Sequence, residues 1–109
     1  MLQDLSEDHV DRIFRALADA TRRDILRRAL DAESTVSELA AVYEISFAAV
    51  QKHIAVLEEA QLVQKRQRGR ERLVSGNPDT IQRAQHLLSK YEQIWRNRVQ
   101  QLDALLAEE

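Results

Sequence analysis

The chain has 109 residues, of which 44% are hydrophobic and 31% charged, with a formal net charge of -2 and no cysteine. This length fits one domain with a modest core, and the lack of cysteine excludes a disulfide framework and a thiolate metal site. No apolar stretch could span a membrane and no signal-peptide pattern follows Met1, so we expect a soluble, cytoplasmic protein.

A first helix is predicted over residues 8–18. Ser6, followed by Glu7 and Asp8, is typical of a capped helix start. An apolar stripe continues the helix to Ala18 and consists of Val10, Ile13, Phe14 and Leu17.

A second helix, TRRDILRRAL, is predicted to follow with Asp19 as its N-cap. Its buried side is predicted to consist of Ile25, Leu26 and Leu30. Its four arginines are predicted to form a solvated face and not a binding site: Arg22, Arg23, Arg27 and Arg28.

Residues 36–60 have the form of a helix-turn-helix. Residues 32–35 break the helical pattern, and residues 36–42 resume it as a short helix that Ser34 or Thr35 would cap. Leu39 and Val42 are predicted to point inward, and residues 43–45 form a tight turn into the next helix. Two short helices joined by so brief a turn are typical of this motif.

The second helix of this motif, SFAAVQKHIAVLEEA, begins at Ser46 and has two different faces. The apolar stripe predicted to dock on the core contains Phe47, Val50, Ile54 and Leu57. The other face is small and polar, and offers Ala48, Ala49, Gln51 and Lys52. Amide, ammonium and methyl groups suit base edges and phosphates in a major groove, although the helix alone also fits an ordinary amphipathic surface helix.

Residues 62–75 are predicted to form a hairpin of two short strands around a turn at Gly69. Its tip contains Lys65, Arg66, Arg68, Arg70 and Arg72, opposed only by Glu71. Residues 50–75 hold six Lys or Arg against three Glu, a net charge of +3, which leaves -5 for the rest of the chain. A solvated turn is the alternative, but a polar-faced helix followed by an arginine-tipped hairpin favours a reading helix and a wing that grips phosphates.

A long helix is predicted over residues 78–107. Asn77, Pro78 and Asp79 provide an N-cap, a proline at the first position and an acid in the first turn. Its apolar residues repeat every seven positions, with Arg98 interrupting one row, which is typical of a packing face for another helix. At about 1.5 Å per residue this helix is too long for a domain of this size to cover, so we expect a symmetric homodimer. The expected interface contains Phe14, Ile81, Leu88, Tyr91, Trp95 and Leu102.

The segments FRALADATRRDILRRAL and TVSELAAVYEISFAAVQKHIAVLEEAQLVQKRQRGRERLV, together with the last helix, resemble the ArsR/SmtB family of bacterial winged-helix repressors. The resemblance implies a mainly α fold with a small β-hairpin, in the order α-α-α-α-β-β-α, with a long C-terminal dimerisation helix. It further implies a homodimer that binds double-stranded operator DNA near its own promoter. The helix from Ser46 would be the recognition helix and residues 62–75 the wing.

The chain departs from the metal-sensing members that it resembles. Thr35 and Ser37 stand where those members have cysteines, and Asp79 is followed by Ile81 where they have a D-x-H motif. A single nearby histidine, His86, cannot assemble a tetrahedral site, and His9 and His53 are isolated and expected to have structural or surface roles. We therefore expect no metal and no cofactor. A small molecule, a partner protein or no effector at all remain as alternatives.

No glycine-rich phosphate loop or nucleophile-base pair indicates an enzyme. The function predicted is that of a sequence-specific DNA-binding regulator, and the alternative is a winged-helix adaptor that binds protein and not DNA. The predicted DNA contacts are Ser46, Ala48, Ala49, Gln51, Lys52, Arg66, Arg68 and Arg70.

Overall fold

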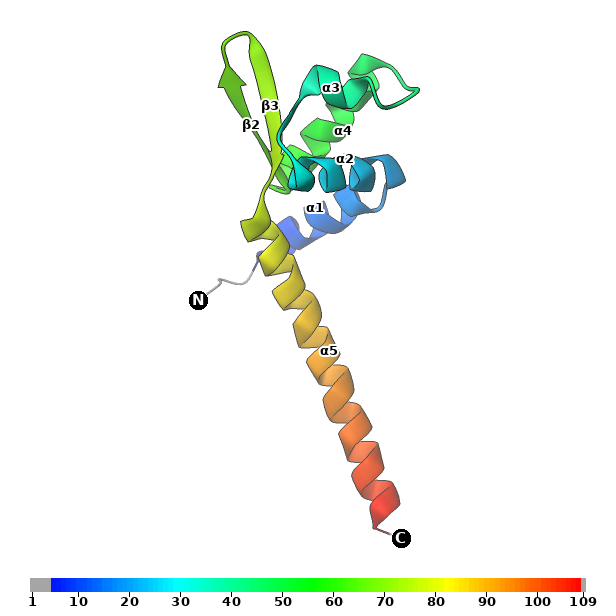
Figure 1. Ribbon diagram of the computed structural model, residues 1–109. Helices are drawn as coiled ribbons and strands as arrows, with labels where there is room; N and C mark the ends of the chain where they lie inside the picture. The colour runs from blue at the N-terminus through cyan, green and yellow to red at the C-terminus, as the bar shows by residue number, and fades with distance from the viewer. Residues whose placement is uncertain (1–4, 109) are drawn as a thin grey trace.

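The computed structural model describes residues 5–108 as five helices and three strands (Figure 1). In chain order they are α1 (Glu7–Leu17), α2 (Ala20–Asp31), β1 (Ser34–Thr35), α3 (Val36–Ala40), α4 (Phe47–Glu59), β2 (Val63–Arg68), β3 (Glu71–Gly76) and α5 (Pro78–Ala107). The β2–β3 hairpin, α3 and α4 lie at one end of the molecule. Helix α5 extends away from the opposite end (Figure 1).

Side-chain caps set the starts of four helices. Ser6, Asp19 and Ser46 each accept a hydrogen bond from the backbone N–H three residues later, which confirms the predicted starts of α1, α2 and α4. Thr35, one of the two caps considered for α3, forms a reciprocal capping box with Glu38. Asn77 precedes α5 as predicted but makes no side-chain cap bond, so Pro78 and the acidic Asp79 in the first turn are the signals that mark this start.

The sheet has three strands and not the two of the predicted hairpin. Ser34 and Thr35, predicted as part of a break between helices and as candidate caps of α3, form β1 and pair antiparallel with Val74 and Leu73 of β3. The strand order is β1-β3-β2. The mainly helical fold with a β-hairpin and a long last helix is confirmed, with β1 as the addition. This short strand ties the start of α3 to the base of the hairpin.

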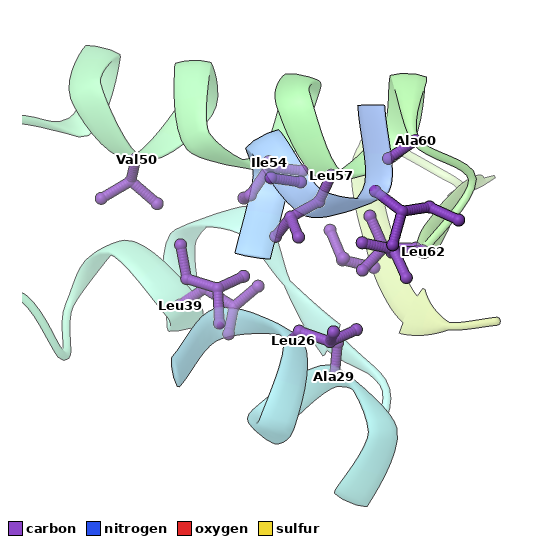
Figure 2. Close-up of a cluster of buried hydrophobic side chains, with 13 residues drawn as sticks. Leu26, Ala29, Leu39, Val50, Ile54, Leu57, Ala60 and Leu62 are labelled. Atoms are coloured by element: carbon purple, nitrogen blue, oxygen red, sulfur yellow. The ribbon is translucent and has the colours of Figure 1, made fainter. Parts of the chain in front are cut away.

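The core lies between α1, α2, α3, α4 and the base of the sheet (Figure 2). Its α4 side chains are three of the four predicted from the apolar stripe, Val50, Ile54 and Leu57, and all three are fully buried. Three side chains predicted to face the core are instead exposed: Leu30, Val42 and Phe47. Phe47 is 48% exposed because it opens the first turn of α4, beyond the edge of the packed layer.

Leu30 has a different role, because it lies against Gly76 where β3 leads into α5. A Cβ atom at Gly76 would stand 2.3 Å from Leu30 Cδ2 and 3.0 Å from Leu30 Cα. No real side chain tolerates the first of these distances without movement of its neighbour. A side chain at this position would have to displace Leu30, so the close approach favours glycine at the junction of β3 and α5.

Helix α4 ends in a left-handed residue that is not glycine. Gln61 has φ of 60°, and the N–H groups of Gln61 and Leu62 donate to Glu58 O and Leu57 O at 2.9 and 3.0 Å. This is the hydrogen-bond pattern of a Schellman motif, in which glycine is preferred. Gln61→Gly should therefore raise the free energy of unfolding by about 0.5–1 kcal/mol, which urea titration can measure. Gln64→Gly in β2, where φ is ordinary, should lower it by about the same amount; a loss in both variants would contradict this account.

Helix α5 leaves most of its apolar stripe in solvent. The molecule measures 70 × 32 × 24 Å, and its long axis follows the projecting helix (Figure 1). Ile81 packs against the domain's own core. The stripe beyond it is exposed and consists of Leu88, Tyr91, Ile94, Trp95, Leu102, Leu105 and Leu106. Within residues 5–108, no helix combines the length and apolar character that a membrane span requires.

Candidate nucleic-acid interface

The face of α4 that points away from the core is formed by small and polar residues. Ser46 Oγ accepts a hydrogen bond from Ala49 N at 3.1 Å, so this hydroxyl is used to begin the helix. Ala48, Gln51 and Lys52 are exposed and Ala49 is half-buried. Within residues 5–108, the side chains of Gln51 and Lys52 make no hydrogen bond or ion pair, so both are available to a ligand.

The hairpin presents its arginines at a tight two-residue turn. Arg68 pairs with Glu71 in the register, and Gly69 and Arg70 form the loop. Gly69 has φ of +61°, as the first position of a type II′ turn requires, which explains glycine at this point. Arg68 makes only a long contact of 3.5 Å with Glu71. Arg70 and Arg72 have no partner among the described residues.

The other two cations of the hairpin are held by the body of the domain. Arg66 donates two parallel hydrogen bonds to Glu33, at 2.9 and 2.8 Å, and this guanidinium lowers the pKa of the Glu33 carboxyl. Lys65 Nζ lies 3.5 Å from Glu58 Oε1 at the end of α4. The five cations seen in the sequence therefore divide into two that anchor the hairpin and three that project from it.

A groove of about 360 Å³ joins the helix and the hairpin. Gln51 of α4 and Arg70 and Arg72 of the hairpin line the same groove, together with residues of β1, α3 and the first turn of α4. Phe47, exposed against prediction, is part of its wall. The structure thus brings an uncommitted amide and two uncommitted guanidinium groups to one surface, a set suited to base edges and phosphates.

The turn between α3 and α4 is bound to α2 by a polar cluster. Tyr43 Oη donates to Asp24 Oδ2 at 2.6 Å, and Arg28 Nε and Arg27 Nη2 donate to the same carboxylate at 2.9 and 2.7 Å. Arg28 also lies 6.0 Å from the centre of the Tyr43 ring. The prediction of a purely solvated arginine face on α2 is therefore wrong for Arg28. It is also wrong for Arg22, whose guanidinium donates to backbone carbonyls of α1.

Removing the Tyr43 hydroxyl tests this cluster. Tyr43→Phe should lower the free energy of unfolding by about 1–2 kcal/mol, since it removes a hydrogen bond to a charged group that is partly screened by solvent. Thermal unfolding by circular dichroism measures the change. Ser89→Ala is the control, because it also removes a hydroxyl, and Ser89 is exposed on α5 outside the rows of the seven-residue seam. Equal losses in the two variants would contradict the role of the hydroxyl.

The same cluster should respond to pH in a defined direction. The hydrogen bonds from Tyr43, Arg27 and Arg28 lower the pKa of Asp24. The stability that this carboxylate contributes is therefore present above its unfolded pKa of about 4, and is lost as the pH falls through the lower folded value. Burial, and then the bond to Asp24, raise the pKa of Tyr43 to about 12. The contribution of the neutral hydroxyl is complete below its unfolded pKa of about 10 and is lost as the pH rises through the folded value.

Among residues 5–108, no three His, Cys, Asp or Glu side chains are grouped closely enough to hold a metal ion. His86 is exposed on α5. His9 and His53 contact other helices of the domain.

Comparisons with known proteins identify the fold family. Residues 12–66 match a family described as a helix-turn-helix domain. The HTH-type transcriptional regulator Rv2034 of Mycobacterium tuberculosis is 41% identical over 68 residues, which cover 62% of this chain and 64% of that regulator. The uncharacterized HTH-type transcriptional regulator YuzN of Bacillus subtilis is 36% identical over 78 residues, or 65% of this chain and 85% of YuzN.

Solved structures narrow the assignment. The crystal structure of the ArsR family transcriptional regulator RHA00566 matches with a TM-score of 0.79 and 29% identity, over 86% of this chain and 97% of that chain. The chain belongs to the ArsR family of helix-turn-helix transcriptional regulators. An ArsR-like regulator from Rhodococcus sp. RHA1 matches this ArsR-family chain with a TM-score of 0.81 and 26% identity, over 90% of the chain and 92% of its own.

A third structure shares the fold at lower identity. The homodimeric winged helix-turn-helix DNA-binding domain Mb0332 of Mycobacterium bovis has a TM-score of 0.64 and 21% identity, and the match covers 84% of the ArsR-family chain and 92% of that domain. The family, the winged helix-turn-helix fold and the prediction that the chain is not an enzyme are confirmed.

The ArsR-family chain contains groups at this surface that sequence reasoning missed. Arg72 lines the groove beside Gln51, although only Arg66, Arg68 and Arg70 were predicted as contacts. The sequence shows that Arg72 belongs to the run of cations in the hairpin, but it does not show that the side chain lines the groove. Glu33, which binds Arg66 from 33 residues away, carried no local signal at all.

Proposed function

We propose that this ArsR-family regulator is a homodimeric repressor that binds an inverted-repeat operator in double-stranded DNA, in the cytoplasm. The observation that carries the proposal is the shared groove of α4 and the hairpin. There Gln51, Arg70 and Arg72 converge without partners among residues 5–108. In this assignment residues 36–60 are the helix-turn-helix, residues 62–75 are the wing, and α4 is the recognition helix.

The contacts divide by chemistry. Ala48, Ala49, Gln51 and Lys52 would face base edges and the adjoining backbone, and the exposed N-terminus of α4 at Ser46 would face a phosphate. Arg68, Arg70 and Arg72 would neutralise phosphates from the wing. Arg66 would act through its bidentate bond to Glu33 and hold the wing in place.

The homodimer is proposed from the apolar stripe of α5. Trp95 is 65% exposed in the single chain, in a row with Leu88 and Leu102 at the seven-residue spacing of a helix-packing face. Phe14 of α1 is exposed as well. The homodimeric state of the Mycobacterium bovis domain supports this assignment. A two-fold dimer places two recognition helices on one duplex, so the operator should be an imperfect inverted repeat with half-site centres about 34–36 Å apart, or a multiple of that distance.

Arg66 tests which arginines of the wing contact phosphate and which hold the wing in place. Arg66→Ala should leave the slope of log K against log salt nearly unchanged, because this guanidinium is bound to Glu33 and not to phosphate. Arg70→Ala should lower the slope by about one per protomer. Fluorescence anisotropy with a labelled duplex over a salt series measures both. If Arg66→Ala lowered the slope by a full unit per protomer, Arg66 would leave Glu33 and contact a phosphate in the complex.

A gel shift with the intergenic DNA upstream of the gene, followed by footprinting, tests the function. The proposal predicts a protected inverted repeat and binding that survives excess scrambled duplex. Equal binding to upstream and scrambled DNA would refute the operator. No binding to either, at physiological salt, would favour the alternative of a protein-binding adaptor.

A further inference from the structure

Helix α1 is bound to the end of α4 by a buried histidine. His9 of α1 is 8% exposed, and its Nε2 atom lies 2.7 Å from the carbonyl oxygen of Ala60, the C-cap of α4. A carbonyl only accepts, so Nε2 carries the hydrogen of this bond. The imidazole thus satisfies one of the last carbonyl groups of α4, which an α-helix cannot pair by itself.

The other end of α1 is linked to the middle of α4 through Arg22 of α2. Arg22 Nε and Nη2 donate to Ala16 O and Arg15 O, in the last turn of α1, at 2.8 and 2.9 Å. Its Nη1 atom lies 3.4 Å from His53 Nδ1. Asp19 Oδ1 lies 4.0 Å from the same nitrogen, so Arg22 and Asp19 both approach this edge of the imidazole.

The two links attach at separate points on α4. His53 and Ala60 are two turns apart, about 10 Å along the helix axis. Between them, Ile13 and Ala16 of α1 share the apolar core with Ile54 and Leu57 of α4. Apolar contacts are non-directional and permit sliding, whereas hydrogen bonds at two separated points fix both the position and the angle of one helix against the other.

We propose that His9 and Arg22 are positioning residues that hold the recognition helix at a fixed place relative to α1, and so set the separation of the two recognition helices in the dimer. The inference rests on the homodimer of the proposed function, in which α1 contributes Phe14 to the interface. The half-site spacing that the protein accepts would then depend on these two side chains as well as on the α5 seam.

The distance between the two α4 helices tests this directly. The chain has no cysteine, so Ala55→Cys, on the exposed side of α4, carries the only spin label. Double electron–electron resonance on the DNA-free dimer then reports one inter-label distance. It is measured in this background and with His9→Leu or His9→Gln added. Leucine removes the donor, whereas the glutamine amide restores a donor at a similar reach.

The expected result is a single narrow distribution that becomes about twofold broader in His9→Leu and returns to its original width in His9→Gln, because the bond and not the ring volume sets the position. An unchanged width in folded, dimeric His9→Leu would overturn the inference, as would equal broadening in His9→Gln. If His9→Leu does not fold, His53→Ala decides by the same criterion, since it leaves both Arg22 bonds to α1. A label pair with no dipolar signal in the parent protein would instead refute the dimer.

Discussion

Trp95→Glu should convert the protein to monomer and abolish operator binding. A large apolar side chain contributes about 1.5–3 kcal/mol when buried, and a carboxylate placed unpaired in the same seam adds a penalty of several kcal/mol. Because the proposed dimer is two-fold symmetric, each substitution occurs twice in the interface. Trp95 is 65% exposed in the single chain, so the isolated domain loses little packing by the substitution.

Sedimentation velocity at micromolar concentration measures the oligomeric state, and thermal unfolding shows that the domain still folds. Gln100→Glu is the matched control, because it introduces the same charge on the exposed opposite side of α5. It should sediment as a dimer and bind the operator as the parent protein does. A monomeric parent protein, or dimeric Trp95→Glu, would contradict an interface built on the α5 stripe.

Arg70→Ala should weaken binding to operator and to random duplex about equally, whereas Gln51→Ala should weaken binding to the operator alone. A lost phosphate contact lowers the salt slope by about one per protomer and keeps the preference for operator. A lost base contact costs about 1–3 kcal/mol per protomer on the operator and leaves the slope unchanged. Gln51 and Arg70 line the same groove. The different effects of the two substitutions would therefore arise from the part of the DNA that each side chain contacts, base edge or phosphate.

Anisotropy titrations of operator and scrambled duplex over a salt series separate the two effects. Both variants must first sediment as dimers. Gln67→Ala is a suitable control, because its amide donates to Gly69 O at 2.8 Å inside the turn. It should change neither the slope nor the preference by as much as either test variant. A lower slope in Gln51→Ala together with an unchanged slope in Arg70→Ala would reverse the assignment of the two surfaces.

Features set by local chemistry could be predicted from the sequence. Ser6, Asp19 and Ser46 cap helices because each side chain reaches an N–H only three residues ahead, and all three starts were predicted correctly. The same holds for Gly69, which the two-residue turn requires, and for the inward row of α4 from Val50 to Leu57.

Features that depend on contacts far apart in the chain could not be predicted. Strand β1 has only two residues and exists because Thr35 and Leu73 pair across the fold. In the sequence, Arg66 cannot be distinguished from the other cations of the hairpin, because its partner Glu33 is brought beside it only by the fold. His9 and Ala60 are separated by 51 positions, so no periodicity indicates their bond. Periodicity also assigned Phe47 to the core, although the helix extends past the packed layer at that point.

The central claim is that α4 reads base sequence, and the specificity ratio of one variant tests it most directly. The dissociation constants of the parent protein and of Gln51→Ala are measured for the footprinted operator and for a scrambled duplex at one salt concentration. We expect the ratio of the two constants to fall by at least about tenfold in Gln51→Ala, while binding to the scrambled duplex stays the same. An equal loss of affinity for both duplexes, with the ratio preserved, would show that α4 does not read sequence.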